Sequence, residues 1–403
     1  MKWLKKFENG LRYIGLLVLA VASFSFAMVQ GGFVSWFLFA AFLPVVLYSS
    51  FLFIYPIKKI RVQRELANKE FVAGETVPAR LHITLPWRIP IPYLFIHDRV
   101  IRKRKNHMER SWHSLQVPFF KKTLVCEYEI PEISRGEFTF TDIEMTIADL
   151  FGFVRKTFRK EVPDQIIVYP ATIPLHYYPD SHEFEYGTAK TKDLVQRDTT
   201  IAVSVRQYQQ GDRFSWINWK ASARRNELMT KEFEQRKNHD VLFVLDRSPC
   251  EQFELLVTFC ASMITAVQKA GIDAGLYSIG EEREYIPPHQ GEAHRKKIFL
   301  TLARIEDDAS LELARVFQTD FLFRQHIQHI VIIVHTLKND LTTELVELAK
   351  LRKQISVFVI KGKNEQFHRE EFILSSTLKQ RGIAAEFVRE GEFADALSRG
   401  EVG

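Results

Sequence analysis

Cysteine is scarce in this chain, and its placement suggests no crosslink. The 403 residues contain three cysteines, Cys126, Cys250 and Cys260, and none belongs to a Cys-x-x-Cys pair. An odd and scattered set argues against both a disulfide framework and a zinc site, because each needs grouped cysteines. We therefore expect the soluble part of the protein to be reduced and cytosolic.

The short motifs of common enzymes are also missing. The sequence has no Gly-x-Ser-x-Gly elbow, Walker loop, His-Glu-x-x-His or Gly-x-Gly-x-x-Gly. A Cys-His nucleophile made from Cys250 and His335 would lack an identifiable third group to orient the histidine. We predict that the chain is not an enzyme. Its formal net charge of +6 is modest for this length, so no nucleic-acid partner is needed to explain it.

Apolar sequence is abundant at the N-terminus. Tyr13–Val29 and Phe33–Tyr55 carry no charged residue, and each is close to the roughly 20 residues that a membrane-spanning helix needs. A cleaved signal peptide is disfavoured, since no small-x-small site precedes a polar start and a second apolar run follows directly. We predict a transmembrane hairpin over residues 1–57.

Basic residues flank both ends of this hairpin. They are Lys2, Lys5, Lys6 and Arg12 before it, and Lys58, Lys59, Arg61 and Arg64 after it. The positive-inside rule then places both the N-terminus and the C-terminal domains in the cytoplasm. The same clusters are expected to contact anionic headgroups of the lipid bilayer.

Residues 58–170 show the pattern of a β-sandwich. Strands are expected at Val77–Leu85, Tyr93–Ile101, Leu124–Ile130, Gly136–Ile147 and Ile166–Tyr169. Short alternating runs separated by Gly and Pro are typical of such folds. The basic run Arg99–Arg110 is interpreted as a solvated strand end or loop, with a patch for lipid or an acidic partner as the alternative.

Residues 240–403 change to strands that alternate with amphipathic helices. Strands are expected at Val241–Leu245, Ala274–Ile279, Ile330–Val334, Ser356–Ile360 and Ala384–Val388, and helices at Glu251–Ala270, Glu292–Ile305, Leu341–Lys353 and Gln366–Lys379. This order predicts a doubly wound, largely parallel sheet. The whole chain is thus a multidomain α+β protein, with a connector at 171–239.

Ligands of such sheets collect where the strands end, which directs attention to Asp246 and Ser248 after the first strand. In the von Willebrand factor A fold this position carries Asp-x-Ser-x-Ser, which helps to hold Mg²⁺. Here Cys250 replaces the second Ser, and a thiol is a poor ligand for that ion. No Thr lies at a second loop over 287–297, and His335-Thr336 stands where Thr-Asp is expected. Capping of the next helix is the alternative role.

The connector holds the most distinctive motif. Its residues of interest are Tyr208, Gly211, Asp212, Trp216, Trp219, Lys220, Arg224 and Lys231. Together with Arg135-Gly136 and the segment Asp149–Phe153, this motif resembles the domain of unknown function 58 family, whose members usually begin with two membrane helices. The resemblance covers essentially the whole chain. It departs from the family at Ser215-Trp216 and at Asn218, where an Asp that can pair with Arg224 is common.

The resemblance implies partners rather than chemistry. The family tends to accompany MoxR-type AAA+ ATPases and transglutaminase-like membrane proteins, so a von Willebrand A-like adaptor or scaffold in an envelope-related process is expected. The alternative is a metal-dependent ligand binder or hydrolase that uses the loop of Asp246 and Ser248.

Physically, Gly211-Asp212 reads as a turn and Ile217–Arg225 as a short helix. Trp216 and Trp219, three residues apart, would then lie on nearly one face. Such a pair can form a hot spot for a partner or can lock the β-sandwich onto the α/β domain. Basic residues nearby can bind an acidic group or pair with neighbouring carboxylates.

Overall fold

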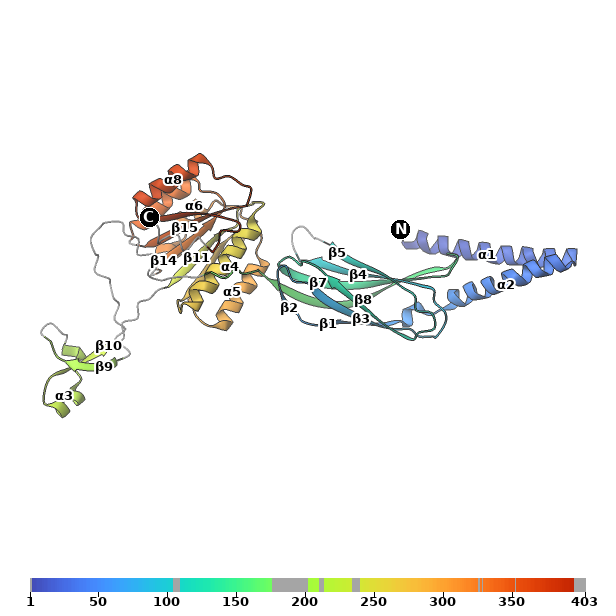
Figure 1. Cartoon of the computed structure of the whole chain (residues 1–403), viewed down its shortest axis with the longest axis horizontal. Coiled ribbons are helices and arrows are strands. Elements are labelled where there is room, and N and C mark those ends of the chain that lie inside the picture. Colours follow the sequence, from blue (N-terminus) through green and yellow to red (C-terminus); the bar gives the residue numbers. More distant parts are fainter. Residues whose placement is uncertain are drawn as a thin grey trace. The chain divides into compact units, whose positions relative to one another are not determined.

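The computed structural model describes residues 2–103, 109–175, 202–209, 214–233, 240–324, 327, 329–351 and 353–394. The chain divides into two compact units, one formed by residues 1–171 with 299–304 and the other by 172–298 with 305–403. It combines two N-terminal apolar helices with several sheets (Figure 1). The predicted mixed α and β composition is therefore confirmed.

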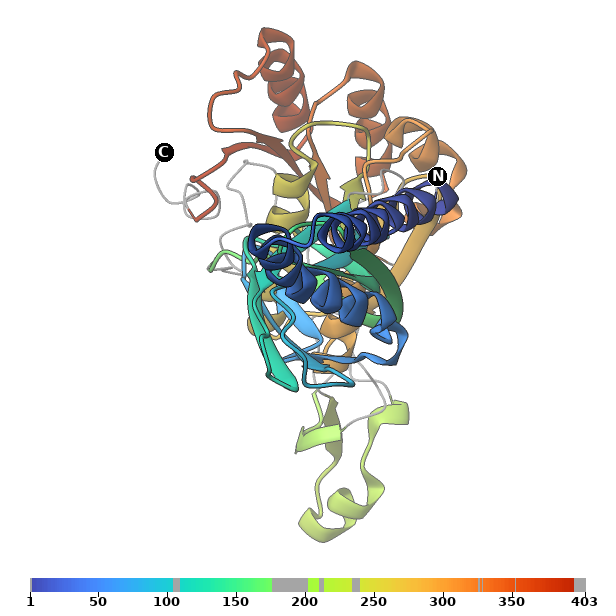
Figure 2. The same cartoon turned by 90° about the vertical axis from the view of Figure 1, so that its right-hand side faces the viewer.

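The first two helices form an antiparallel hairpin (Figures 1 and 2). Helix α1 covers Lys2–Gln30 and α2 covers Phe33–Ile54, and the turn between them uses Gly31 at a φ of 62°. Residues Arg12–Gln30 and Phe33–Ile54 are long and apolar enough for each to cross a membrane.

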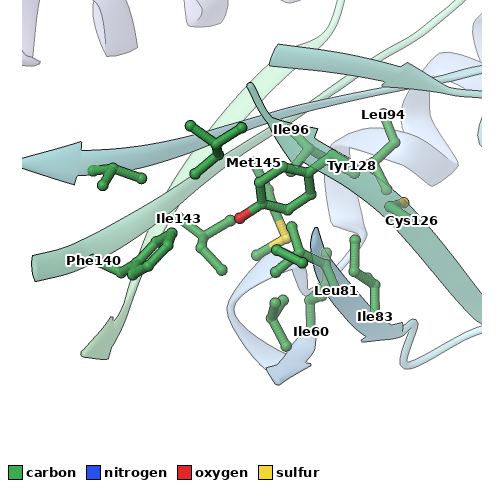
Figure 3. Packing of buried hydrophobic residues seen from close by; sticks show 14 of the residues in the cluster. Ile60, Leu81, Ile83, Leu94, Ile96, Cys126, Tyr128, Phe140, Ile143 and Met145 are labelled. Atoms are coloured by element: carbon green, nitrogen blue, oxygen red, sulfur yellow. The ribbon is translucent and has the colours of Figure 1, made fainter. Parts of the chain in front are cut away.

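Two sheets pack face to face after the hairpin and the short helix η1 (Ile57–Lys59). The first has the order β1 (Arg61–Leu66), β3 (Val77–Thr84), β6 (Thr123–Ile130); the second has the order β2 (Glu70–Val72), β8 (Arg155–Tyr169), β7 (Gly136–Ala148), β4 (Tyr93–Arg102), β5 (Glu109–Gln116). Side chains of both sheets share one buried core (Figure 3). In β3 buried and outward positions alternate, as a half-buried strand requires.

A buried ion pair lies at the centre of this unit. Both side chains of the pair Arg64 and Asp98 are inaccessible, and the Arg64 Nη2 to Asp98 Oδ1 distance is 2.6 Å. Tyr128 donates a further hydrogen bond to Asp98, and the Arg64 guanidinium lies 4.4 Å from the ring centre of Phe140. The sequence predicted that Arg64 contacts lipid headgroups. This prediction is wrong, because the Arg64 side chain is buried in the β-sandwich and pairs with Asp98.

The basic run Arg99–Arg110 is described by the structure only in part. Arg102 is buried in β4, and Arg99 lies 3.7 Å from Glu144, while residues 104–108 fall outside the described residues. Arg99 and Arg102 thus stabilise the sandwich and do not form a surface patch. Strand β5 was not expected here.

The second unit contains a six-stranded sheet with the order β13, β12, β11, β14, β15, β16. The strands are β11 (Val241–Asp246), β12 (Ala274–Ile279), β13 (Arg283–His289), β14 (His329–Val334), β15 (Gln354–Lys361) and β16 (Ala384–Arg389). All neighbours are parallel except β12 and β13. Both β13 and helix α6 were missed from the sequence.

Helices cover both faces of this sheet (Figures 1 and 2). They are α4 (Phe253–Lys269), α5 (Glu292–Arg304), α6 (Leu313–Thr319), α7 (Asn339–Ala349) and α8 (Arg369–Gln380), with η3 (Phe321–Arg324) after α6. Helices α6, α7 and α8 share a core with one face, while Phe259 of α4 packs on Phe358 of β15 at a ring distance of 5.2 Å.

Candidate functional site

The order of the six strands reverses beside β11. The chain passes from β11 to β12 on one side and later reaches β14 on the other side. Such a switch point leaves a crevice at the carboxyl ends of the two central strands. Asp246 ends β11, and His335 follows β14, so both residues lie at this edge of the sheet, where the sequence placed them.

Asp246 and Ser248 form a closed turn. The Asp246 Oδ1 atom accepts hydrogen bonds from the Ser248 amide at 3.0 Å and from the Ser248 hydroxyl at 2.8 Å. Burial raises the pKa of Asp246 above its usual 3.8, although the bonds from Ser248 and the charges of Lys338 and His335 act in the opposite direction. The carboxylate is therefore occupied by its own loop.

Arg247, between them, points to a different neighbour. Its Nη2 atom lies 2.6 Å from Asp308 Oδ1, and its Nε donates to the carbonyl oxygen of Glu306 at 2.7 Å. A Cβ atom at Gly280 would lie 2.3 Å from the Arg247 guanidinium carbon and from Asp308. The guanidinium is thus a buried clamp on segment 305–309, and Gly280 leaves room for it.

This clamp corrects the expected position of the second loop. Residues 287–289 end the edge strand β13, and α5 begins at Glu292. Segment 305–309 instead lies beside the Asp246 turn, where the Ala309 amide donates to the Arg247 carbonyl at 3.0 Å. The antiparallel strand β13 follows β12 in the chain. The loop that lies beside the Asp246 turn therefore comes later in the sequence than residues 287–297.

Cys250 and His335 do not form a nucleophile pair. Burial is the main cause that raises the pKa of the Cys250 thiol to about 11, and Asp246, Asp307 and Glu365 act in the same direction. His335 directs Nδ1 to the carbonyl oxygen of Ile360 at 3.0 Å and Nε2 to the Glu365 carboxylate at 3.0 Å. The thiol is protonated at neutral pH, and both imidazole nitrogens serve other groups.

A second buried network joins the loops after β14 and β15. The Lys361 ammonium is 1% exposed and lies 3.4 Å from Glu371 and 3.5 Å from Glu365. Glu371 also accepts hydrogen bonds from the amides of Leu337 and His368, the latter at the start of α8. Sequence reasoning missed this network, although a Lys directly after an apolar strand was a usable signal.

These residues do not fit a magnesium ion. Among the described residues, no group of three or more His, Cys, Asp or Glu side chains is arranged for a metal. Asp246 Oδ1 already accepts two hydrogen bonds, the Ser248 hydroxyl proton points to it, and Cys250 offers a protonated sulfur. A hard divalent ion needs several free oxygen ligands, so Asp246 and Ser248 serve here as a loop closure.

The motif of the connector folds as a small hairpin. Strands β9 (Ala202–Gln207) and β10 (Met229–Phe233) pair antiparallel, and η2 (Phe214–Trp216) and α3 (Trp219–Arg225) lie between them. Gly211 and Asp212 lie outside the described residues. Tyr208 stacks on Phe214 at a ring distance of 6.1 Å, and its amide donates to the Leu228 carbonyl.

Two small polar residues hold the hairpin together. Asn218 caps α3 by accepting from the Ala221 amide at 3.2 Å, in place of the expected bond to Arg224. The Ser222 hydroxyl donates to the Asn218 carbonyl and accepts from the Met229 amide, both at 2.9 Å. Ser222 was not among the predicted residues, since its role depends on the position of β10.

The two tryptophans do not share a buried face. Trp216 belongs to η2 and is half-buried, whereas Trp219 starts α3 and is 67% exposed. The expectation of one common face was wrong, because the helix begins at Trp219 and not at Ile217. Lys220 and Arg224, one helical turn apart, are exposed beside Trp219, while Lys231 in β10 is half-buried.

The elements together define a class of protein with two apolar helices, a β-sandwich and a mostly parallel α/β sheet joined by a motif hairpin. Residues 204–370 match the family described as Protein of unknown function DUF58. An uncharacterized protein of Bacillus subtilis (strain 168), YeaD, is 32% identical over 385 residues, which are 95% of this chain and 96% of that protein. The chain belongs to the DUF58 family.

Solved structures give weaker similarities. The CARDB domain of the PF1109 protein from Pyrococcus furiosus is 12% identical, with a TM-score of 0.19 over 27% of this chain and 92% of that domain. The sporulation control protein Spo0M of Bacillus subtilis is 13% identical, with a TM-score of 0.17 over 27% of this chain and 49% of that protein. Both scores are too low to support a structural argument.

Proposed function

We propose that this protein is a non-enzymatic scaffold, held in the cell membrane by a two-helix hairpin with both termini in the cytoplasm. The helices α1 and α2 are long and apolar enough for two spans, and basic residues flank both. The α/β unit acts as a von Willebrand A-like module, as the Asp-x-Ser turn at the strand-order switch point suggests. In this proposal the protein catalyses no reaction.

The partner that we favour is an AAA+ ATPase of the MoxR type, with a transglutaminase-like membrane protein as a further member of the assembly. The exposed side chain of Trp219 carries this proposal. Trp and Arg dominate binding hot spots, and here exposed Trp219 begins a short helix that also exposes Lys220 and Arg224, on a hairpin that Asn218 and Ser222 already stabilise. An aromatic and basic surface of this kind suits an acidic patch of a partner protein.

The edge of the α/β sheet is the second part of the proposed surface. Its loops are tied internally, by the Asp246 turn, the Arg247 clamp and the Lys361 network. A preorganised surface loses little conformational entropy on binding, which is an advantage for a scaffold. The metal-dependent alternative has less support, because Asp246 Oδ1 already accepts two hydrogen bonds and Cys250 offers sulfur where a hard ion needs oxygen.

Binding of the purified full-length protein, in lipid nanodiscs, to a purified MoxR-type ATPase from the same organism tests the proposal. Trp219→Ala should weaken binding by about tenfold or more, since hot-spot truncation costs about 2 kcal/mol. Phe372→Ala is the matched control, because Phe372 is an aromatic residue of the same unit that is 50% exposed on α8. Equal affinity of the Trp219 variant and the wild type would refute the assigned surface.

A further inference from the structure

Three loops with exposed apolar tips lie at the end of the β-sandwich that is nearest the membrane hairpin of α1 and α2. Strand register places them together: Arg61, which follows the hairpin, pairs with Thr84 of β3, and Thr84 pairs with Thr123 of β6. In the other sheet, Tyr93 pairs with Ala148, and Ala148 pairs with Arg155. Loops 85–92, 117–122 and 149–154 therefore all lie at the end where α2 enters (Figure 1).

Side chains of α2 bind these loops before the helix has ended. Tyr48 donates to the Pro90 carbonyl at 2.8 Å, and Ser49 donates to Asp149 Oδ2 at 2.9 Å. Lys156 donates to the carbonyls of Phe53 and Tyr55 and thereby caps the helix. Loops 85–92 and 149–154 are thus fixed along the last turns of α2, and backbone bonds between Ile91 and Phe119 join loop 117–122 to them.

The rise per residue of α2 gives the depth in the bilayer of the loops that it binds. Ser49 precedes the last residue of α2, Ile54, by five positions, which correspond to about 8 Å of helix. The 22 residues of α2 are about 33 Å long, against a hydrocarbon layer of roughly 30 Å. When α2 spans the bilayer, loops bound at Tyr48 and Ser49 lie at the boundary between headgroups and acyl chains.

The loop tips have the chemistry of that boundary. Six apolar side chains on them are between 43% and 63% exposed; they are Trp87, Val117, Phe119, Phe120, Leu150 and Phe151. Exposed basic residues stand beside them at Arg88, Lys121, Lys122 and Arg155. The three loops contain a single acidic residue, Asp149, and it is buried by its bonds to Ser49 and to the Val154 amide.

The backbone conformation of Phe119 also supports a binding role for the exposed loop 117–122. Its backbone adopts a φ of 46°, a left-handed conformation that costs a non-glycine residue about 1–2 kcal/mol. Two backbone hydrogen bonds to Ile91 hold it there, yet its ring stays 57% exposed. Backbone strain that the surrounding structure maintains is often found at binding segments.

We propose that these three loops form a membrane-interface anchor, which inserts Trp87, Phe120 and Phe151 among lipid headgroups and acyl chains. The basic residues beside them then meet anionic phosphate groups, and amphipathic aromatic rings favour that depth. The anchor holds the sandwich against the bilayer. It rests on the membrane hairpin of the proposed function but concerns a separate surface, which binds lipid and not protein.

Fluorescent labelling of the full-length protein tests the anchor. Single positions are labelled with an environment-sensitive dye by Phe120→Cys or Phe151→Cys in a Cys250→Ser background, where the remaining cysteines are buried. The protein is reconstituted into phosphatidylcholine and phosphatidylglycerol vesicles that contain lipid with a nitroxide near the headgroup. Asn68→Cys, at the opposite end of the sandwich, is the matched control, and Leu47→Cys in α2 reports insertion of the hairpin.

We expect labels at 47, 120 and 151 to be quenched at least about twofold more strongly than the label at 68, because insertion reaches roughly 5–10 Å into the boundary. If only the label at 47 is quenched, the hairpin spans the bilayer and the anchor is wrong. If the label at 47 is not quenched either, the membrane hairpin is wrong and the anchor fails with it.

Discussion

Replacement of Arg247 by Met examines how the edge of the α/β sheet is stabilised. Arg247→Met keeps most of the apolar volume and removes the guanidinium, which leaves Asp308 and the carbonyl of Glu306 without their donor. Loss of one partner of a buried ion pair typically costs about 3–5 kcal/mol. The side chains of Arg247 and Asp308 are 5% and 18% exposed, so we take the lower limit, about 3 kcal/mol.

The expected effect is local, because the Arg247 clamp joins β11 to segment 305–309. Hydrogen exchange of the full-length protein, followed by mass spectrometry, measures it directly, whereas a single melting temperature is poorly defined for several domains. A loss of about 3 kcal/mol corresponds to roughly hundredfold faster exchange in peptides that contain the Ala309 amide. That amide is bonded to the Arg247 carbonyl.

A surface pair in the same unit supplies the control for this experiment. Lys350 and Glu347 form an ion pair in which the side chains are 63% and 58% exposed, and such pairs contribute about 0–1 kcal/mol. Lys350→Met should therefore leave the exchange nearly unchanged. If Arg247→Met alters exchange around Ala309 no more than Lys350→Met does, the buried clamp is not what stabilises this edge.

Three further outcomes concern the same edge. Iodoacetamide should alkylate Cys250 about a hundredfold more slowly at pH 8 than a thiol of pKa 9, and the rate should rise about tenfold per pH unit until the pKa of about 11; a rate plateau near pH 9 would contradict this. Because burial raises the pKa of Asp246 above 3.8, ionisation of Asp246 lowers native stability as pH rises through that pKa. Asp246→Asn should thus gain stability relative to wild type as pH rises from about 4, as denaturant unfolding would measure, and a decreasing difference would show the opposite shift. Millimolar Mg²⁺ should leave thermal unfolding unchanged, whereas a clear increase would restore the metal-binding alternative.

Periodicity in the sequence predicted the elements that have a strong apolar pattern. The strand expected at Ala274–Ile279 occurs with the same bounds, and the helix expected at Glu292–Ile305 ends one residue earlier. Buried parallel strands are continuous apolar runs, so their signal is local. Strand β13 escaped prediction, because Arg283–His289 has no alternating apolar pattern, contains Pro287-Pro288 and pairs only along one edge.

The chemical roles of residues at the sheet edge were less accessible to sequence reasoning. Asp246 and Ser248 were correctly placed at the carboxyl end of β11, since that position follows from strand order alone. The partners of Arg247 and Lys361 depend on residues that are 61 and 10 positions further along the chain. Such distant pairings follow from the three-dimensional fold, and no spacing rule reveals them.

The motif hairpin shows the same division. Sequence reasoning located the motif but assigned the same role to both tryptophans. The start of α3 at Trp219 instead separates the half-buried Trp216 from the exposed Trp219. Asn218 determines that start by capping the helix. A departure from the family pattern thus has a structural role that the resemblance alone did not imply.

Crosslinking in native membranes tests the scaffold proposal most directly. The tagged full-length protein, solubilised after mild crosslinking, is purified and analysed by mass spectrometry as wild type, Trp219→Ala and Asp246→Ala. We predict that a MoxR-type AAA+ ATPase copurifies with the wild type and is depleted at least about tenfold with Trp219→Ala, at unchanged yield of the protein. Recovery of the same ATPase with all three forms, or of no specific partner with the wild type, would contradict the account.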